Sequence, residues 1–195
     1  QTNQELSQLI KKHQPVLMHL LDSALSPAML KNIAQNPPGA PWYGFARISR
    51  EIADEDFCLS LKKSGCVMLK LGVESGDQEV LDKLNKGINL TDVAKALKAL
   101  KKVGIAAYVY LLFGTPPENE ESARKTMDFT VAHSANIDFL NLAIFNLPIA
   151  SAEAQKLETD KFYEGDLSLY GSFRHPAGWD RQIARDFLEK TFKRN

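Results

Sequence analysis

The chain has 195 residues, of which 44% are hydrophobic and 25% are charged, as is usual for a globular domain with a sizeable core. Its 24 Lys and Arg residues balance 24 Asp and Glu residues, so we expect neither a nucleic-acid-binding protein nor a membrane-surface protein. No apolar run reaches the roughly 20 residues that span a bilayer, and the first residues do not resemble a secretory leader. A cytoplasmic protein is therefore predicted.

Two periods of apolar residues alternate along the chain, one typical of helices and one of strands. Strand–helix units joined by short links predict a parallel sheet with crossover helices. We place helix N-caps at Asp54 and Thr91 and left-handed C-caps at Gly65 and Gly104. In chain order we predict a helix over residues 4–12, strands over 16–21 and 42–48, a helix over 54–64, a strand over 67–73, helices over 77–84 and 91–103, a strand over 105–113, a helix over 120–133 and a strand over 137–147.

The two sides of the predicted strands differ in polarity. In residues 67–73 one side is entirely apolar, whereas Lys70 lies on the other side, as does Glu74 just beyond. The strands near 108–114 and 139–146 show the same asymmetry. A doubly wound sheet needs apolar residues on both faces, whereas a barrel with a ligand-holding interior needs one mixed face. The pattern therefore predicts a β/α barrel, with an inward-facing Lys70–Glu74 ion pair as the structural alternative to a functional role for these two residues.

Polar or glycine-rich sequences follow all five predicted strands. Because active sites of β/α barrels lie at the carboxyl ends of the strands, these sequences together predict one composite site. They are Asp22-Ser23, Arg47 to Ser49, Glu74-Ser75-Gly76, Gly114 to Glu118, and Asn146 to Pro148.

Cys58 and Cys66 are the two cysteines of the sequence. Their spacing matches neither a zinc site nor an iron–sulfur site. We predict that both are buried free thiols.

Two stretches of this sequence resemble the radical S-adenosylmethionine (radical SAM) proteins. The stretch from Gly65-Cys66 through Gly72-Val73-Glu74-Ser75-Gly76 to Lys86-Gly87 is similar to the family's "G-C … G-V/I-E-S-G … L … K-G" pattern. It most resembles the subgroup that often has an amino-terminal cobalamin-binding domain. The stretch from Leu111 to Glu118 resembles the fifth-strand motif, usually "G-F-P-G-E", with Pro117 in place of the second glycine.

The resemblance implies a TIM-barrel-like partial barrel of six β/α units, of which this chain would supply five. It implies a [4Fe-4S] cluster on a C-x3-C-x2-C loop after the first strand, S-adenosylmethionine (SAM) bound to that cluster, and a 5′-deoxyadenosyl radical that abstracts hydrogen from a substrate. Cobalamin is a further cofactor of the subgroup. The sequence has no C-x3-C-x2-C, so we assign no metal ligand. We expect the chain alone to be inactive and to need the missing amino-terminal part of the same protein.

The resemblance also implies cofactor-binding roles for residues at the strand ends. Glu74 and Ser75 would lie beside SAM, with Glu74 accepting hydrogen bonds from the ribose hydroxyls or the ammonium group. Arg47 would pair with the SAM carboxylate, and Gly114 would allow the backbone to approach the adenine. Asn141 would face inward, with Asn146 as an alternative contact, and Asp22 would face cofactor or substrate. The resemblance does not identify the substrate, nor does it tell whether the substrate is a small molecule or a macromolecule.

The predicted domains are a partial radical SAM barrel over residues 1–148 and a helical extension over 149–195. The extension would contain helices over 151–157 and 180–193 and would either cover one barrel end or shape the substrate pocket. We predict that His175 is an ordinary loop histidine rather than a ligand. The strand near 16–22 would form an edge covered by this tail or by another chain. The alternatives to a radical SAM enzyme are an unrelated β/α-barrel lyase or aldolase, and a non-catalytic binding or scaffold domain.

Overall fold

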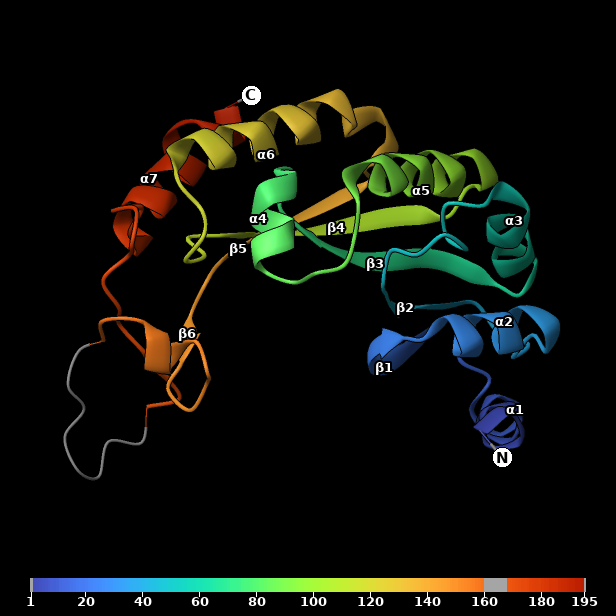
Figure 1. Cartoon of the computed structure of the whole chain (residues 1–195). Helices are drawn as coiled ribbons and strands as arrows, with labels where there is room; N and C mark the ends of the chain where they lie inside the picture. The colour runs from blue at the N-terminus through green and yellow to red at the C-terminus, as the bar shows by residue number, and fades with distance from the viewer. Residues whose placement is uncertain (1, 160–167, 195) are drawn as a thin grey trace. The chain divides into compact units, whose positions relative to one another are not determined.

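The computed structural model describes residues 2–159 and 168–194 (Figure 1). Its helices are α1 (Thr2–His13), α2 (Pro27–Gln35), α3 (Glu55–Lys63), α4 (Gln78–Lys83), α5 (Leu90–Val103), α6 (Glu120–Ala132) and α7 (Arg181–Lys190). Its strands are β1 (Met18–Leu25), β2 (Trp42–Ala46), β3 (Cys66–Glu74), β4 (Ala106–Phe113), β5 (Phe139–Ile144), β6 (Leu147–Pro148) and β7 (Tyr170–Gly171). Among these residues no helix is long and apolar enough to cross a membrane.

Strands β1 to β5 form one sheet in the order of the chain, and this confirms the predicted parallel α/β sheet. β1 pairs in parallel with β2, starting from Met18 opposite Trp42, and β2 pairs in parallel with β3. β1 is an edge strand, and Leu21 on it is 82% exposed. What covers this edge remains a prediction.

The described residues form two compact units. The first comprises residues up to Val73 together with Gly87–Leu111 and Ala132–Asn141. The second comprises Glu74–Lys86, Leu112–Val131 and the described residues from Leu142 onward. The carboxyl ends of β3, β4 and β5 therefore belong to the second unit. The predicted domain boundary at residue 148 stays a prediction.

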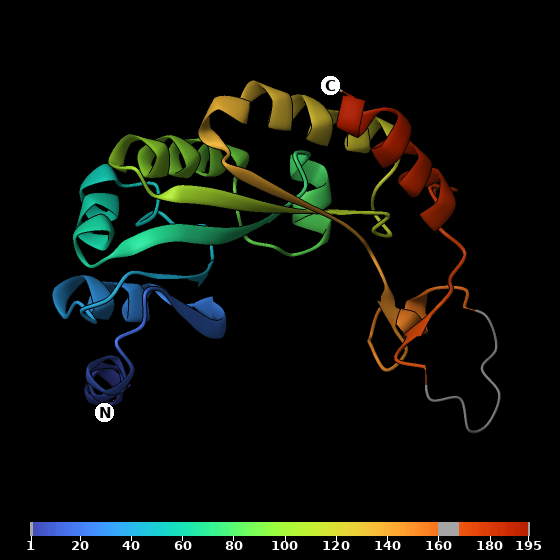
Figure 2. The same ribbon diagram turned by 180° about the vertical axis from the view of Figure 1, so that it is seen from behind.

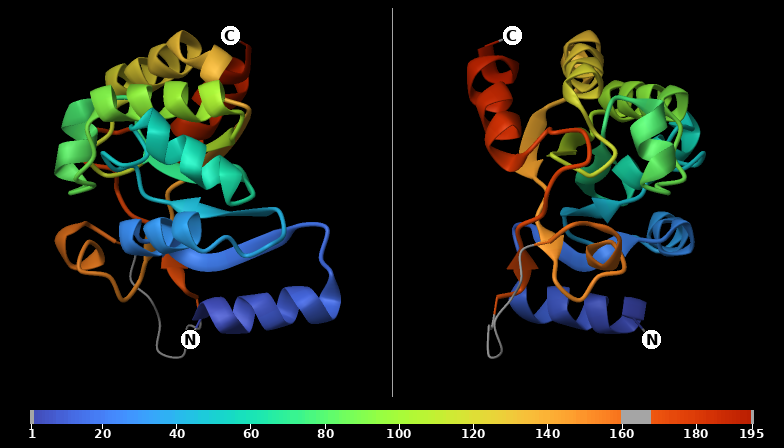
Figure 3. Two further views of the ribbon diagram at one scale, coloured as in Figure 1. Left: turned by 90° about the vertical axis from the view of Figure 1, so that its right-hand side faces the viewer. Right: turned by 60° about the vertical axis from the view of Figure 1, so that its left-hand side comes forward.

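Helices α2, α3 and α5 cover one face of the strands in the first unit. Figures 1 and 3 show them in a row, in which α3 contacts both α2 and α5. Alternation along the strands supplies the core, because Leu69 and Leu71 on β3 are fully buried whereas Lys70 between them is not. Trp42 is also fully buried, and its Nε1–H donates to the carbonyl oxygen of Ser64 at 3.2 Å.

Helix boundaries agree with the predicted caps at most of the positions tested. Asp54 caps α3 by accepting from the N–H of Phe57 at 2.7 Å, and Gly104 ends α5 in the left-handed conformation, both as predicted. Gly65, at φ +97°, lies one residue beyond the C-cap of α3. The predicted cap at Thr91 is wrong, because the Asn89 side chain accepts from the Thr91 N–H at 2.8 Å and α5 begins at Leu90.

The second unit packs the carboxyl-terminal helix against the end of β4. Phe113 lies against Phe192, with ring centroids 5.5 Å apart, and Phe187 contacts the Trp179 ring at 5.6 Å. Figure 2 shows α7 beside α6, consistent with Arg124 of α6 lying 5.9 Å from the Phe187 ring centroid. In the described part of the tail, β7 pairs with β6 as an antiparallel ladder, and the helix predicted over 151–157 is a short 3-10 turn at Ala154–Lys156.

Candidate functional site

The backbone at the end of β3 is strained at a polar residue. Glu74 has φ +69°, in the left-handed region that residues other than glycine seldom occupy. Its carboxylate accepts from the Lys86 ammonium at 2.9 Å, and its side chain is only 19% exposed. Such backbone strain persists only where the surrounding structure stabilises it, and it is frequent at ligand-binding sites. The surrounding residues therefore fix the conformation of Glu74.

The loop that follows Glu74 is fastened to helix α6. The Ser75 hydroxyl lies 3.1 Å from the Thr126 hydroxyl, and the Gly76 N–H donates to that same Thr126 oxygen at 2.9 Å. Asp77 pairs with the Lys125 ammonium at 3.1 Å. Ser75 is fully buried, and its hydroxyl also accepts a hydrogen bond from the Asp77 N–H, so this hydroxyl stabilises the loop. Its predicted contact with SAM stays a prediction.

The end of β4 forms a tight loop around a buried carboxylate. Gly114 has φ +75°, a conformation that favours glycine, and its N–H donates to the Glu118 carboxylate. The Trp179 Nε1–H donates to the same Glu118 oxygen at 3.0 Å. The other carboxylate oxygen is buried without a hydrogen-bond partner among the described residues. Burial therefore raises the pKa of Glu118 to about 7, despite the hydrogen bonds that favour its ionised form.

His175 holds the tail onto this loop. Its Nε2 lies 2.9 Å from the Thr115 carbonyl oxygen, which can only accept, so Nε2 carries the proton. Its Nδ1 accepts from the N–H groups of Ala177 and Trp179 at 3.1 and 3.2 Å. His175 thus lies in a loop, as predicted, but it is buried and both ring nitrogens are hydrogen-bonded.

A cavity of about 390 Å³ opens beside Gly114 in the second unit. Its volume lies within the range of roughly 300–1,000 Å³ that is usual for small-molecule sites. Asn146 accepts from the Arg181 guanidinium at its rim, and Phe145 meets the Phe173 ring edge-on at 5.9 Å. The lining residues are Gly114, Phe145, Asn146, Tyr170–Gly171, Ser172, Phe173, His175, Asp180, Arg181 and Gln182.

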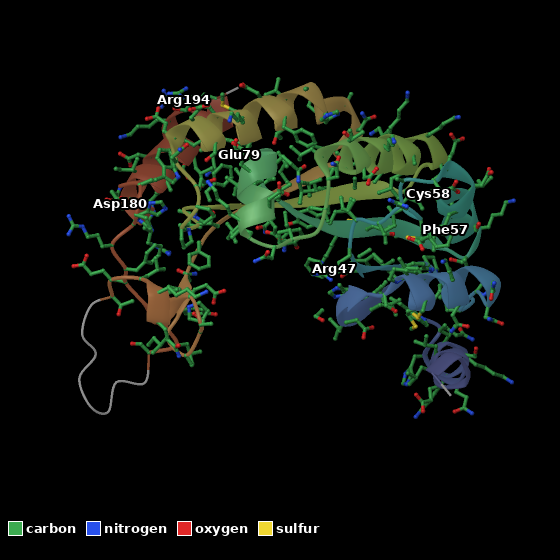
Figure 4. The ribbon with its side chains drawn as sticks, in the orientation of Figure 1. Arg47, Phe57, Cys58, Glu79, Asp180 and Arg194 are labelled. Carbon is green, nitrogen blue, oxygen red and sulfur yellow. The ribbon has the colours of Figure 1, made fainter. Side chains whose placement is uncertain are left out.

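The six predicted cofactor-binding residues divide between the two units. Glu74, Ser75 and Gly114 lie in the second unit. Arg47 and Asp22 lie in the first, where both side chains are exposed. Asp22 lies within β1, and Arg47, labelled in Figure 4, lies one residue beyond β2. Asn141 is half-buried on β5 and lies on the same side of the strand as Phe139, two residues before it. Its predicted inward role stays a prediction. Of these six, Gly114 lines the cavity, together with the alternative contact Asn146.

Neither cysteine fits an iron–sulfur cluster. Burial raises the pKa of both the Cys58 and the Cys66 thiol to about 12, so neither is a thiolate at neutral pH. The Cys58 thiol donates to the Ile52 carbonyl oxygen at 3.1 Å. No three His, Cys, Asp or Glu side chains of the described residues are grouped to hold a metal ion. The prediction of buried free thiols is confirmed.

Comparison with known proteins shows the family. The model of the "Radical SAM superfamily" matches residues 27–130. This chain belongs to the radical SAM superfamily. The finding confirms the resemblance found in the sequence, and it excludes the alternative of an unrelated barrel lyase or aldolase.

The relatives of this radical SAM chain include enzymes and an uncharacterised protein. It is 26% identical over 159 residues to the anaerobic magnesium-protoporphyrin IX monomethyl ester cyclase of Rubrivivax gelatinosus, covering 80% of this chain and 28% of that protein. It is 34% identical over 93 residues to an uncharacterised protein of Methanocaldococcus jannaschii, covering 47% and 18%. The chain thus spans less than a third of the length of these relatives.

A solved structure supports the fold. The radical SAM methyltransferase TsrM from Kitasatospora setae, determined with cobalamin and a [4Fe-4S] cluster bound, aligns with a TM-score of 0.65 at 20% identity. The alignment covers 92% of this chain and 40% of TsrM. The predicted TIM-barrel-like partial barrel of the radical SAM type is confirmed.

The partners of the Glu74 and Glu118 carboxylates were not predicted from the sequence. Lys86 stands in the "K-G" part of the quoted family pattern, and this was the available signal for its pairing with Glu74. Glu118 was recognised as the retained end of the fifth-strand motif. Nothing in the sequence pointed to Trp179, which lies 61 residues further along the chain.

Proposed function

We propose that this chain forms the SAM-binding part of a radical SAM active site in a longer protein. The observation that supports this most directly is the cavity beside Gly114 at the ends of β4 and β5, where barrel enzymes build their sites. The [4Fe-4S] cluster would be held by residues outside this sequence, because neither Cys58 nor Cys66 fits it. When bound, SAM and the cluster would supply the radical chemistry, and this chain would bind and orient SAM.

Four residues of the second unit have side chains or backbone suited to a role in binding SAM. Phe145 offers a ring on which adenine can stack, and the Asn146 amide can hydrogen-bond to an edge of the base. Gly114 has no side chain to obstruct the backbone there. Glu74 would accept hydrogen bonds from the ribose hydroxyls or the ammonium group of SAM, in place of or beside Lys86. The roles of Arg47, Asp22 and Asn141 stay predictions.

Glu74→Gln in the full-length protein should weaken SAM binding about ten- to a hundredfold, because it removes a charge-assisted hydrogen bond worth roughly 1.5–3 kcal/mol. The matched control is Glu79→Gln, an exposed glutamate at the start of α4 (Figure 4). Affinity is measured by equilibrium dialysis of SAM, and thermal stability is recorded alongside it. Lost stability with unchanged SAM affinity would show that the Glu74–Lys86 pair is structural only.

The chain by itself should bind no [4Fe-4S] cluster and cleave no SAM, because it supplies no suitable thiolate. Anaerobic reconstitution followed by iron analysis and absorption spectroscopy measures this directly. Near four irons per chain would contradict the proposal that the cluster ligands lie elsewhere. The same assays on the full-length protein separate the enzyme from a non-catalytic scaffold, which would bind neither cluster nor SAM.

Cobalamin is a further proposed cofactor of the longer protein. The resemblance to the subgroup with a cobalamin-binding domain supports it, as does the fold shared with TsrM, which was determined with cobalamin bound. We propose that the partner of this chain is an amino-terminal part of the same protein that would supply the cluster ligands.

A further inference from the structure

One face of the strands in the first unit is lined with aromatic rings. His19 on β1 stacks on Tyr43 of β2, with centroids 4.3 Å apart and planes 5° from parallel. Phe45 lies 5.0 Å from Tyr110, and the Tyr108 ring joins Tyr110 at 4.8 Å. Phe139 of β5 continues the row, 5.7 Å from Tyr108. These rings alternate with buried residues along β2 and β4, so they occupy the side of the strands opposite to helices α2, α3 and α5.

The rings of this aromatic face remain accessible. Phe139 is 54% exposed, and Tyr43, Phe45, Tyr108 and Tyr110 are all half-buried. Burial, together with the neighbouring Tyr108, raises the pKa of Tyr110, so its phenol stays neutral and adds no negative charge. The face therefore offers π surface of several rings with hydroxyl donors at its edge, which is the usual lining of a site for a flat organic ligand.

The ammonium group of Lys70 lies among these rings. The Lys70 Nζ is 5.2 Å from the Tyr43 centroid and 5.0 Å from the Phe45 centroid, and it lies 3.4 Å from the His19 Nε2. No ion pair found in the described part of the chain includes Lys70. Glu74, its partner in the structural alternative, pairs with Lys86. The aromatic face thus holds a positive charge that π contacts only partly compensate.

We infer that this face binds a planar aromatic carboxylate, whose ring stacks on Phe45 and Tyr110 while its carboxylate meets the Lys70 ammonium. This ligand would be the enzyme's substrate, and that part of the inference rests on the proposed function. Charge complementarity selects the ligand: a neutral aromatic would leave Lys70 unpaired, and a non-aromatic acid would not use the rings.

The test uses this chain without cofactors and three probes of similar size. They are 2-naphthoate, the neutral 2-naphthalenemethanol and the saturated decahydronaphthalene-2-carboxylate, titrated against the protein by NMR. We expect 2-naphthoate to bind about tenfold more tightly than either analogue, because each analogue lacks one of the two interactions. Equal affinity for 2-naphthoate and the alcohol, or no binding of 2-naphthoate, would overturn the inference.

Substitutions separate the two interactions. Lys70→Met should remove the preference for 2-naphthoate over the alcohol, whereas Lys70→Arg should keep it. Tyr110→Leu should weaken the binding of both aromatic probes, 2-naphthoate and 2-naphthalenemethanol, by the same factor. Lys98→Met, which changes an exposed lysine on α5, is the matched control and should alter nothing. A preference that survives Lys70→Met would overturn the inference. Since no SAM or cluster takes part, failure of SAM binding in the full-length protein would not affect this result.

Discussion

Replacing Gly76 by alanine is expected to lower the free energy of unfolding of the second unit by about 3 kcal/mol, the sum of overpacking and a weakened hydrogen bond. A Cβ at this position would lie 2.7 Å from the Phe129 Cβ and 2.7 Å from the Thr126 Cα. Neither the Phe129 Cβ nor the Thr126 Cα can move away without displacing helix α6 or the loop. The displacement would also lengthen the hydrogen bond from the Gly76 N–H to the Thr126 hydroxyl.

The control for this variant is Gly178→Ala, also in the second unit. A Cβ at Gly178 would meet no atom within 4 Å, so only its left-handed backbone, at φ +67°, would be strained. That strain costs roughly 1–2 kcal/mol. Urea unfolding followed by the fluorescence of Trp179 reports on this unit. Equal losses for the two variants would show that the loop accommodates the methyl group and that its contact with α6 is loose.

Strand positions could be predicted because alternation is a local property of the sequence. Leu69 and Leu71 are buried and Lys70 is not, as the parity required. Helix α2 was missed, although Ser26 caps it and Pro27 stands in its first turn. Its signal was weak, since only Leu30 and Ile33 are buried along its length. Two buried residues do not establish a helical period.

Cap positions show how local chemistry leaves alternatives. Asn89 and Thr91 both have side-chain oxygens suited to an N-cap, and the sequence offers no reason to prefer one. The structure selects Asn89, whose side chain accepts from Thr91 itself. A two-residue shift of this kind moves the first turn without changing the helix face.

The candidate site was predictable as a set of strand ends but not as a set of contacts. Glu74 and Gly114 were identified from motifs, yet the strained φ of Glu74 and its pairing with Lys86 depend on how the following loop returns. The Lys70–Glu74 pair, the structural alternative, was plausible from parity alone. Parity places both residues on one side but does not say which neighbours reach them, and the aromatic rings around Lys70 come from other strands.

Glu118→Gln is expected to remove most of the pH dependence of the second unit's stability between about pH 4.5 and pH 7. The ordinary pKa of this carboxyl is 4.5, and burial raises the pKa to about 7 in the folded chain. The folded state therefore holds the proton more tightly than the unfolded state. The stability is fully present below pH 4.5, falls as pH rises toward 7 and is then constant, for a total loss of about 3 kcal/mol.

Glutamine imitates the protonated carboxyl, because its carbonyl oxygen can still accept from the Gly114 N–H and the Trp179 Nε1–H. At pH 8 the Glu118→Gln variant should therefore be more stable than the wild type by about 3 kcal/mol, and near pH 4 the two should agree within about 1 kcal/mol. Urea unfolding at a series of pH values, followed by Trp179 fluorescence, measures the difference, in which other titrating groups cancel. Glu120→Gln, an exposed substitution on α6, should shift stability by less than about 0.5 kcal/mol at every pH. A Glu118→Gln difference that does not change with pH would mean that the carboxyl is ionised in the folded chain. Its hydrogen bonds would then outweigh its burial.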